Sequence, residues 1–136
     1  MIKRKEAMSM DHKENFKGGT GSLSFVHLFT KEELPKTRLC SVLTVEPGAS
    51  VGQHSHTGEG ELYVVLDGPV TLQEDGVDHI LHTGDAEYCS DGHSHGVYNH
   101  TDKPAVLMAI VMLWPGWRKT PGVPAGGRRA FLFFPF

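Results

Sequence analysis

The chain has 136 residues, a length that predicts one domain with a buried core. Its hydrophobic fraction of 39% and charged fraction of 21% are typical of a globular protein in water. The net charge of -3 is uneven, because residues 1–113 carry 9 Lys and Arg against 16 Asp and Glu (-7), and residues 114–136 carry four cations and no acid (+4). An acidic body argues against nucleic acid as the main partner, since phosphate binding needs a basic face.

Membrane and export signals are both missing from the sequence pattern. No apolar run approaches the length needed to cross a bilayer, and the charged N-terminus lacks the apolar stretch of a signal peptide. We therefore expect a cytoplasmic protein with no membrane partner. Cys40 and Cys89 form no CxxC motif, so in a reducing compartment two buried thiols are expected, with a disulfide or a thiolate ligand as the alternative.

The predicted elements begin with an N-terminal arm over residues 1–21, either frayed or a short helical lead, which three glycines near its end interrupt. Short apolar or alternating runs separated by turn residues then predict a β-barrel or sandwich over residues 22–113. A single helical turn is expected at Thr30 to Pro35, because Pro35 prevents a longer helix. The runs that predict strands are 22–29, 38–46, 61–68, 70–74, 77–82, 85–89, 95–100 and 105–113.

Residues 114–136 form an irregular C-terminal tail rich in Pro, Gly and aromatic residues, ending in FLFFPF. Six apolar residues are costly to leave in water. We therefore expect the tail to cover the barrel or a second subunit.

Three imidazoles and one carboxylate, His54, His56, Glu61 and His95, predict a divalent-metal site. His54 and His56 are two residues apart, so on an extended chain their side chains share one face. Gly58 and Gly60 make a turn before Glu61, which opens the next strand, and His95 must come alongside through sheet pairing. Such ligands suit transition metals, and four protein ligands leave two positions of an octahedral ion open.

The segments around these residues resemble the cupin superfamily. Its first motif, G(X)5HXH(X)4E(X)6G, is matched by Gly48, His54, His56, Glu61 and Gly68. Its second, G(X)5PXG(X)2H(X)3N, is matched at its other fixed positions, but Ser90 replaces the usual proline, a change that affects a turn and spares the ligands; the matching residues are Gly84, Gly92, His95 and Asn99.

The resemblance implies an all-β jelly-roll (double-stranded β-helix) barrel in which His54, His56, Glu61 and His95 bind one divalent metal: Mn, Fe, Ni or Zn. Cupins with this ligand set include dioxygenases, oxalate-degrading enzymes, and isomerases or epimerases. We therefore expect an enzyme acting on a small polar metabolite. The alternative is a non-catalytic, metal-dependent binding or sensing module. Single-barrel cupins commonly dimerise, so a homodimer is expected as well.

Residues that neighbour these four each have two alternative roles. Glu59 is either a rival ligand or a solvated turn carboxylate, and His93 is a candidate to face the pocket because it shares parity with His95. Arg38 is the only arginine in the barrel segments that is placed to clamp a carboxylate substrate, with an exposed strand-edge charge as the alternative. The remaining histidines are expected at the surface or rim and the tyrosines in the core or pocket wall: His79, His82 and His100; Tyr63, Tyr88 and Tyr98.

Overall fold

The computed structural model describes residues 1–114, and within that range it is an all-β protein without an α-helix, as predicted. None of its helices is long and apolar enough to span a membrane. The elements are η1 (Lys5–Ala7), β1 (Ser9–Glu14), η2 (Phe16–Gly18), β2 (Ser22–His27), β3 (Thr37–Val45), β4 (Ser50–Ser55), β5 (Glu59–Asp67), β6 (Val70–Glu74), β7 (Val77–Leu81), β8 (Ala86–Cys89), β9 (Ser94–Tyr98) and β10 (Ala105–Leu113).

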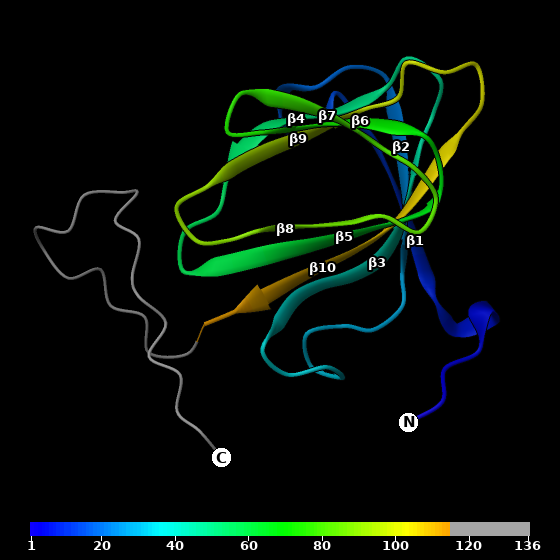
Figure 1. The fold of residues 1–136 in the computed structure, drawn as a ribbon. Coiled ribbons are helices and arrows are strands. Elements are labelled where there is room, and N and C mark those ends of the chain that lie inside the picture. The colour runs from blue at the N-terminus through cyan, green and yellow to red at the C-terminus, as the bar shows by residue number, and fades with distance from the viewer. Residues whose placement is uncertain (115–136) are drawn as a thin grey trace, which may run out of the picture.

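Two antiparallel sheets lie one over the other and form the predicted jelly-roll (Figure 1). One sheet has the strand order β1-β2-β3-β10-β5-β8, and the other has the order β4-β9-β6-β7. Chain neighbours such as β4 and β5 belong to different sheets, so the chain crosses repeatedly between the layers. This topology brings segments that are far apart in sequence to the same interior.

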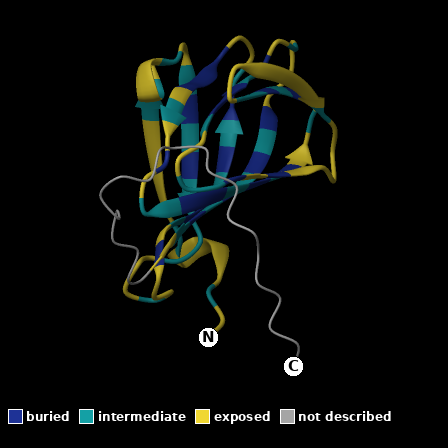
Figure 2. Ribbon diagram, turned by 60° about the vertical axis from the view of Figure 1, so that its left-hand side comes forward, coloured by how far each residue is buried: buried dark blue, intermediate teal, exposed yellow. Residues whose placement is uncertain are grey.

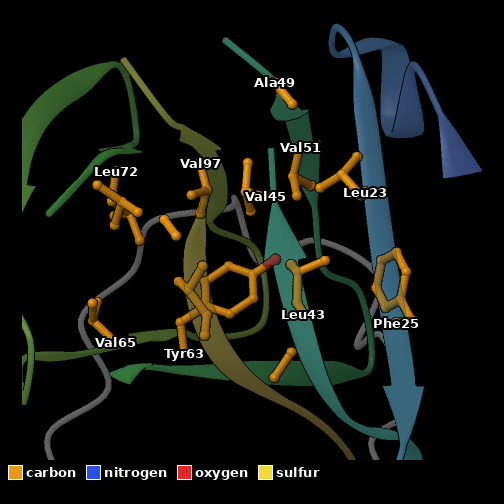
Figure 3. Packing of buried hydrophobic residues seen from close by; sticks show 14 residues of the cluster. Leu23, Phe25, Leu43, Val45, Ala49, Val51, Tyr63, Val65, Leu72 and Val97 are labelled. Atoms are coloured by element: carbon orange, nitrogen blue, oxygen red, sulfur yellow. The ribbon is translucent and has the colours of Figure 1, made fainter. Parts of the chain in front are cut away.

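The core lies between the sheets because alternate residues of each strand point inward. In β10, buried and half-buried residues alternate along the strand, whereas the exposed residues lie on the turns and along the edge strands β1 and β7 (Figure 2). Both sheets contribute to one continuous apolar cluster (Figure 3), which includes Leu23, Phe25, Leu43, Val51, Val65, Leu72, Val97 and Leu107. The polar site described below adjoins that cluster at Tyr63, whose ring stacks on His95.

Regular structure begins earlier than the predicted start at Ser22. Residues Ser9–Glu14 form β1, which pairs with β2 from Ser9↔His27 to Glu14↔Ser22. The sequence pattern misses this strand because β1 is an edge strand with almost every residue exposed, so it has no alternating apolar face. The predicted turn at Thr30 is present, since the Glu33 N–H donates to the Thr30 carbonyl at 3.1 Å. The predicted tail lies outside the described residues, except for Trp114.

Asn99, the last residue of the second motif, holds a turn together. Its buried Nδ2 donates to the carbonyls of Val45 (2.9 Å) and Lys103 (2.7 Å), and its Oδ1 accepts from the Thr101 N–H at 3.0 Å. These bonds connect the start of β10 to the end of β3. The β9–β10 turn is therefore held by this amide together with the Thr101 hydroxyl, which donates to the Lys103 carbonyl at 3.0 Å.

Candidate metal centre

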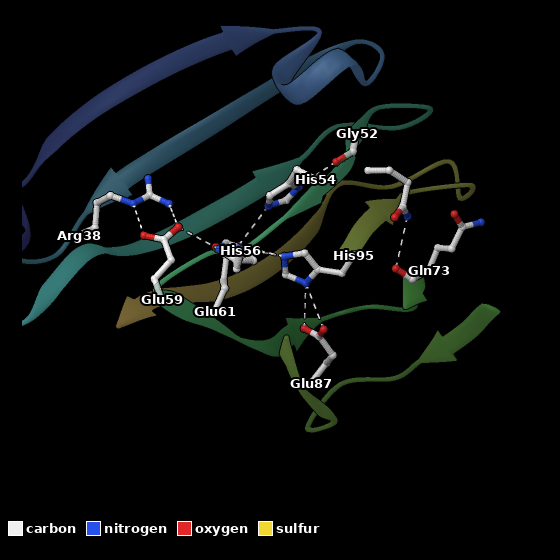
Figure 4. A network of polar contacts seen from close by, with 10 residues as sticks. Arg38, Gly52, His54, His56, Glu59, Glu61, Gln73, Glu87 and His95 are labelled. Atoms are coloured by element: carbon white, nitrogen blue, oxygen red, sulfur yellow. Dashed lines mark hydrogen bonds and ion pairs between the residues drawn. The ribbon is translucent and has the colours of Figure 1, made fainter. Parts of the chain in front are cut away.

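The jelly-roll brings His54, His56, Glu61 and His95 together, with their ligand atoms all within 4.8 Å of one another. His54 comes from β4, His56 follows the end of β4, and His95 lies beside His54 on β9 through the pair His54↔His95. Glu61 reaches the group from β5 in the other sheet. The four side chains converge in Figure 4.

A β-bulge turns His54 toward the interior. Val51 pairs with Val97 and His54 pairs with His95, so Gly52 and Gln53 of β4 stand opposite Gly96 alone. Val51 and Val97 are core residues, and simple alternation from Val51 would direct His54 outward. The extra residue reverses the parity, as bulges beside functional sites often do. His54 and His95 thereby share the face that Val51 and Val97 occupy.

The ring nitrogens that face the centre are the three Nε2 atoms. Glu61 Oε2 lies 3.1 Å from His56 Nε2, 3.1 Å from His95 Nε2 and 3.4 Å from His54 Nε2. The side chains of His56 and His95 are 1% and 0% exposed, whereas that of His54 is 12% exposed and lies nearest to solvent. Solvent therefore reaches the cluster most readily on the His54 side.

The opposite ring nitrogens, Nδ1, all have acceptors, and this fixes the tautomers. His54 Nδ1–H donates to the Gly52 carbonyl at 2.9 Å, and His56 Nδ1–H donates to Glu59 Oε1 at 3.0 Å. His95 Nδ1–H donates to Glu87, whose two oxygens lie at 3.1 and 3.2 Å. A neutral imidazole that donates through Nδ1 presents a lone pair at Nε2.

This donor set fits a divalent transition metal. The Nε2 atoms of His56 and His95 are 3.1 Å apart, and two lone pairs at that distance repel each other unless a proton or a metal ion is bound. Orientation of a metal-binding imidazole by a carboxylate or carbonyl on its other nitrogen is the usual arrangement in metal sites. Imidazole and carboxylate ligands together suit several transition-metal ions.

Charges in the cluster shift its pKa values strongly. Burial raises the pKa of Glu61, but hydrogen bonds from the three imidazoles outweigh burial and hold that pKa well below its usual range. Burial lowers the pKa of His95, but Glu61 and Glu87 together raise it to about 9. The pKa of His56 is raised by its hydrogen bond to Glu61, against the effect of burial. Glu61 is therefore ionised and attracts a cation, and a metal ion that binds here displaces protons from the imidazoles.

Glu59 is neither a rival ligand nor a solvated carboxylate. It contacts His56 on the ring nitrogen that faces away from the cluster, and its side chain is only 15% exposed. Both Glu59 oxygens are bound by Arg38, at 2.8 Å through Nε and 2.6 Å through Nη2 (Figure 4). Arg38 is 50% exposed and its guanidinium already holds a carboxylate of the same chain, which fits the expected alternative of an exposed charge rather than a substrate clamp.

His93 does not face the pocket, although it shares parity with His95. It lies in the turn before β9, with a side chain that is 47% exposed and bonded to Asp75. Parity fails there because the strand begins only at Ser94. The three histidines expected at the surface or rim are exposed: His79, His82 and His100.

Glu87 is a residue of the site that no motif in the sequence predicts. The alternation of the short strand β8 could have indicated it, because Glu87 and Cys89 are buried while Ala86 and Tyr88 are exposed. An acidic residue at an inward position needs a partner, and here the partner is His95. Glu87 also lines a pocket of about 310 Å³ between β6, β7 and β8, with Leu72, Glu74, His79, Leu81, Ala86 and Tyr88.

Aromatic and sulfur side chains complete the surroundings. Tyr63 is a buried pocket-wall residue whose ring stacks on His95, with centroids 4.9 Å apart. Burial and the nearby Glu61 raise its pKa well above the usual value. Tyr88 is 40% exposed and Tyr98 is half-buried. Cys40 and Cys89 are free and buried.

Ser90 leaves the turn before β9 intact. The His93 N–H donates to the Ser90 carbonyl at 3.1 Å, and Gly92 adopts a φ of +84° that favours glycine. Asp91 Oδ1 accepts from the Gly58 N–H at 2.7 Å and ties this turn to the one that follows His56. The departure from the motif thus lies in a turn that hydrogen bonds hold.

An antiparallel jelly-roll with three histidines and a glutamate converging inside it defines a class of small barrel protein with a candidate metal site. Comparison with known proteins agrees. A family model for the cupin domain matches residues 41–111. A Thermotoga maritima protein named oxalate-binding protein is 32% identical over 114 residues, which are 83% of this chain and 94% of that protein. The chain belongs to the cupin family.

Solved structures share the fold. A Thermotoga maritima crystal structure, described as a predicted oxalate decarboxylase, has a TM-score of 0.79 at 32% identity and covers 83% of this chain and 99% of that one. A sugar phosphate isomerase of the cupin superfamily from Silicibacter pomeroyi has a TM-score of 0.62 at 26% identity, with coverages of 68% and 60%. The described activities differ although the fold is shared, so fold alone does not define function.

Proposed function

We propose that this chain binds one divalent transition metal through His54, His56, Glu61 and His95, and that the bound metal holds a small carboxylate such as oxalate. The observation that carries the proposal is the convergence of three imidazole Nε2 atoms on Glu61 Oε2 at 3.1–3.4 Å. When bound, a divalent metal with four protein ligands supplies open coordination positions and acts as a Lewis acid toward anions.

The name of the Thermotoga maritima relative, oxalate-binding protein, supports an anion of this kind. Oxalate is small enough for an enclosed barrel and offers carboxylate oxygens, which divalent metals accept readily. Arg38 is committed to Glu59, so the metal rather than an arginine would hold the anion in this proposal.

Binding without turnover is the form that the described residues favour. The two carboxylates beside the ligands, Glu59 and Glu87, each accept an imidazole N–H, and Tyr63 is buried with a raised pKa. Within residues 1–114, each of these candidate acid–base groups is thus committed to another partner or buried. Turnover is the second candidate, because one similar structure is described as a predicted oxalate decarboxylase.

Metal content and oxalate binding test the proposal together. Protein purified without added metal should contain one transition-metal ion per chain by elemental analysis. Removing a buried ligand with His56→Ala should abolish this content and oxalate binding by calorimetry. The matched control, His93→Ala at an exposed histidine, should retain both. Oxalate binding that survives in the metal-stripped protein or in His56→Ala would contradict the proposal.

Incubation of the metal-loaded protein with oxalate separates the two forms. Oxalate recovered unchanged indicates a binding module. Release of carbon dioxide with formate indicates a decarboxylase, and consumption of dioxygen indicates an oxidase.

A further inference from the structure

The three imidazoles of the candidate metal centre are oriented by acceptors of different charge. His54 donates to a neutral backbone carbonyl, that of Gly52, whereas His56 and His95 donate to carboxylates. A negative partner on Nδ1–H increases the electron density at Nε2 and makes the ring a stronger metal ligand. The three imidazoles should therefore differ in their strength as metal ligands, with His54 the weakest.

Glu59 and Glu87 differ in how their charges are compensated. Arg38 binds both oxygens of Glu59, so the negative charge behind His56 is balanced by a guanidinium. Glu87 is 7% exposed, and within the described residues it forms no ion pair with an Arg or Lys. Both of its oxygens lie within 3.2 Å of His95 Nδ1.

Two uncompensated negative charges thus face the centre, one on Glu61 as a direct ligand and one on Glu87 behind His95. Together they match the charge of a divalent ion. A buried negative charge attracts a metal ion but repels an anion that binds to the metal, and burial keeps water from screening either effect. A buried carboxylate such as Glu87 should therefore raise the affinity of the site for the metal ion and lower its affinity for an anion on that metal.

We propose that Glu87 is a positioning residue that strengthens His95 as a metal ligand and lowers the affinity of the metal-loaded site for anions, and that Arg38 acts in the opposite direction by balancing the charge of Glu59 behind His56. This inference rests on the proposed function, because it concerns the same metal and anion. Neither Glu87 nor Arg38 contacts the metal in this scheme.

Glu87→Gln tests the inference because it keeps the size of the side chain and removes its charge. With Co²⁺ as the metal probe, the affinity should fall by about 10- to 100-fold, as for other residues that orient metal-binding histidines. The affinity of the Co²⁺-loaded variant for oxalate should rise several-fold. A variant that is merely misfolded would lose both, so the opposite signs are the readout.

Arg38→Gln provides the inverse comparison, since it leaves the Glu59 charge uncompensated. Its Co²⁺ affinity should rise and its oxalate affinity should fall, both by only a few-fold because the Arg38 side chain is 50% exposed and screened by water. Glu74→Gln is the matched charge control, because Glu74 lines the same pocket as Glu87 and pairs with His95 only through the backbone register. It should change either affinity by less than about two-fold, since Glu74 is only half-buried and water screens its charge.

The inference fails if wild-type protein binds Co²⁺ and oxalate but Glu87→Gln binds both equally well or loses both. It fails too if Glu74→Gln reproduces the Glu87→Gln pattern, because the effect would then be long-range charge rather than the bond to His95. The same titrations distinguish failure of the proposed function, because the wild-type protein would then bind neither Co²⁺ nor oxalate.

Discussion

Histidine residues of this chain take different roles according to the partner of each ring. His56 and His95 are buried between carboxylates, and His54 is held by the carbonyl of Gly52. His93, two residues from His95, is exposed and pairs with Asp75. Because Asp75 stabilises the charged form of His93, it raises the pKa of that imidazole, but at the surface and away from the centre. An imidazole is thus a candidate metal ligand when a hydrogen bond from its Nδ1–H orients the ring and its Nε2 lies beside the ligand atoms of the other three residues.

The raised pKa of His95 predicts how the metal-free protein responds to pH. Burial lowers this pKa, but the carboxylates of Glu61 and Glu87 outweigh burial and raise it to about 9, above the usual value of about 6.5 in the unfolded chain. The stabilisation is complete below about pH 6.5 and is lost as pH rises toward 9, by up to about 3 kcal/mol. Metal competes with the same proton, so metal affinity should rise over this window.

Denaturant unfolding of the metal-stripped protein at pH 6, 7.5 and 9 measures this trend. The free energy of unfolding should fall steadily across the three conditions. His93→Ala is the control, because it removes an exposed histidine with its own raised pKa and should leave the trend in place. A free energy that stays constant or increases with pH would contradict the prediction.

At the scale of the element, β4 places two candidate ligands through one irregularity. The bulge at Gly52 and Gln53 turns His54 inward, and the carbonyl of Gly52 orients the same ring. A β-carbon on Gly52 would lie 2.2 Å from the Lys17 carbonyl oxygen and 2.6 Å from the Gly19 nitrogen. The close approach of η2 to β4 therefore requires glycine at the bulge.

Gly52→Ala should therefore destabilise the fold and weaken the metal site together. The atoms that a β-carbon would meet are backbone, so β4 or η2 must move, and we expect a loss of about 2 kcal/mol or more in the free energy of unfolding. Metal affinity should fall because His54 moves with the strand. Ser55→Ala, an equally small change at an exposed position of β4, should alter neither quantity. Thermal unfolding and a metal titration of both variants test this.

At the scale of the molecule, the outer face of the six-stranded sheet is unusually apolar. One row of cross-strand neighbours contains no charged residue and runs through all six strands: Met10, Val26, Val42, Met108, Val64 and Ala86. Ile110, Leu62 and Tyr88 follow in the next row. A two-fold interface uses the same surface on both copies, so a charged residue near the axis would face its own copy. Two chains can meet on this apolar row without burying such like charges.

We propose that this face, rather than the other sheet, is the surface of the expected homodimer. Met108→Lys places a charge in the middle of the row and should convert a dimer to a monomer in sedimentation velocity at micromolar concentration. Ile80→Lys is the control, since Ile80 is 67% exposed on β7 in the other sheet and should leave the dimer unchanged. A monomeric wild-type protein would contradict the proposal.

Local patterns in the sequence were enough for the all-β class, most strands and the cluster of His54, His56, Glu61 and His95. Alternation and motif spacing are properties of neighbouring residues, so they can be recognised without a fold. The exposed strand β1, the bulge at Gly52, the outward turn of His93 and the partners Glu87 and Arg38 depended on tertiary structure. Each results from contacts between segments distant in sequence, where backbone packing and charge pairing override local parity. The sequence by itself determined which residues are available as ligands, and the tertiary structure decided how each is oriented and charged, because those depend on the residues that pack behind the imidazoles.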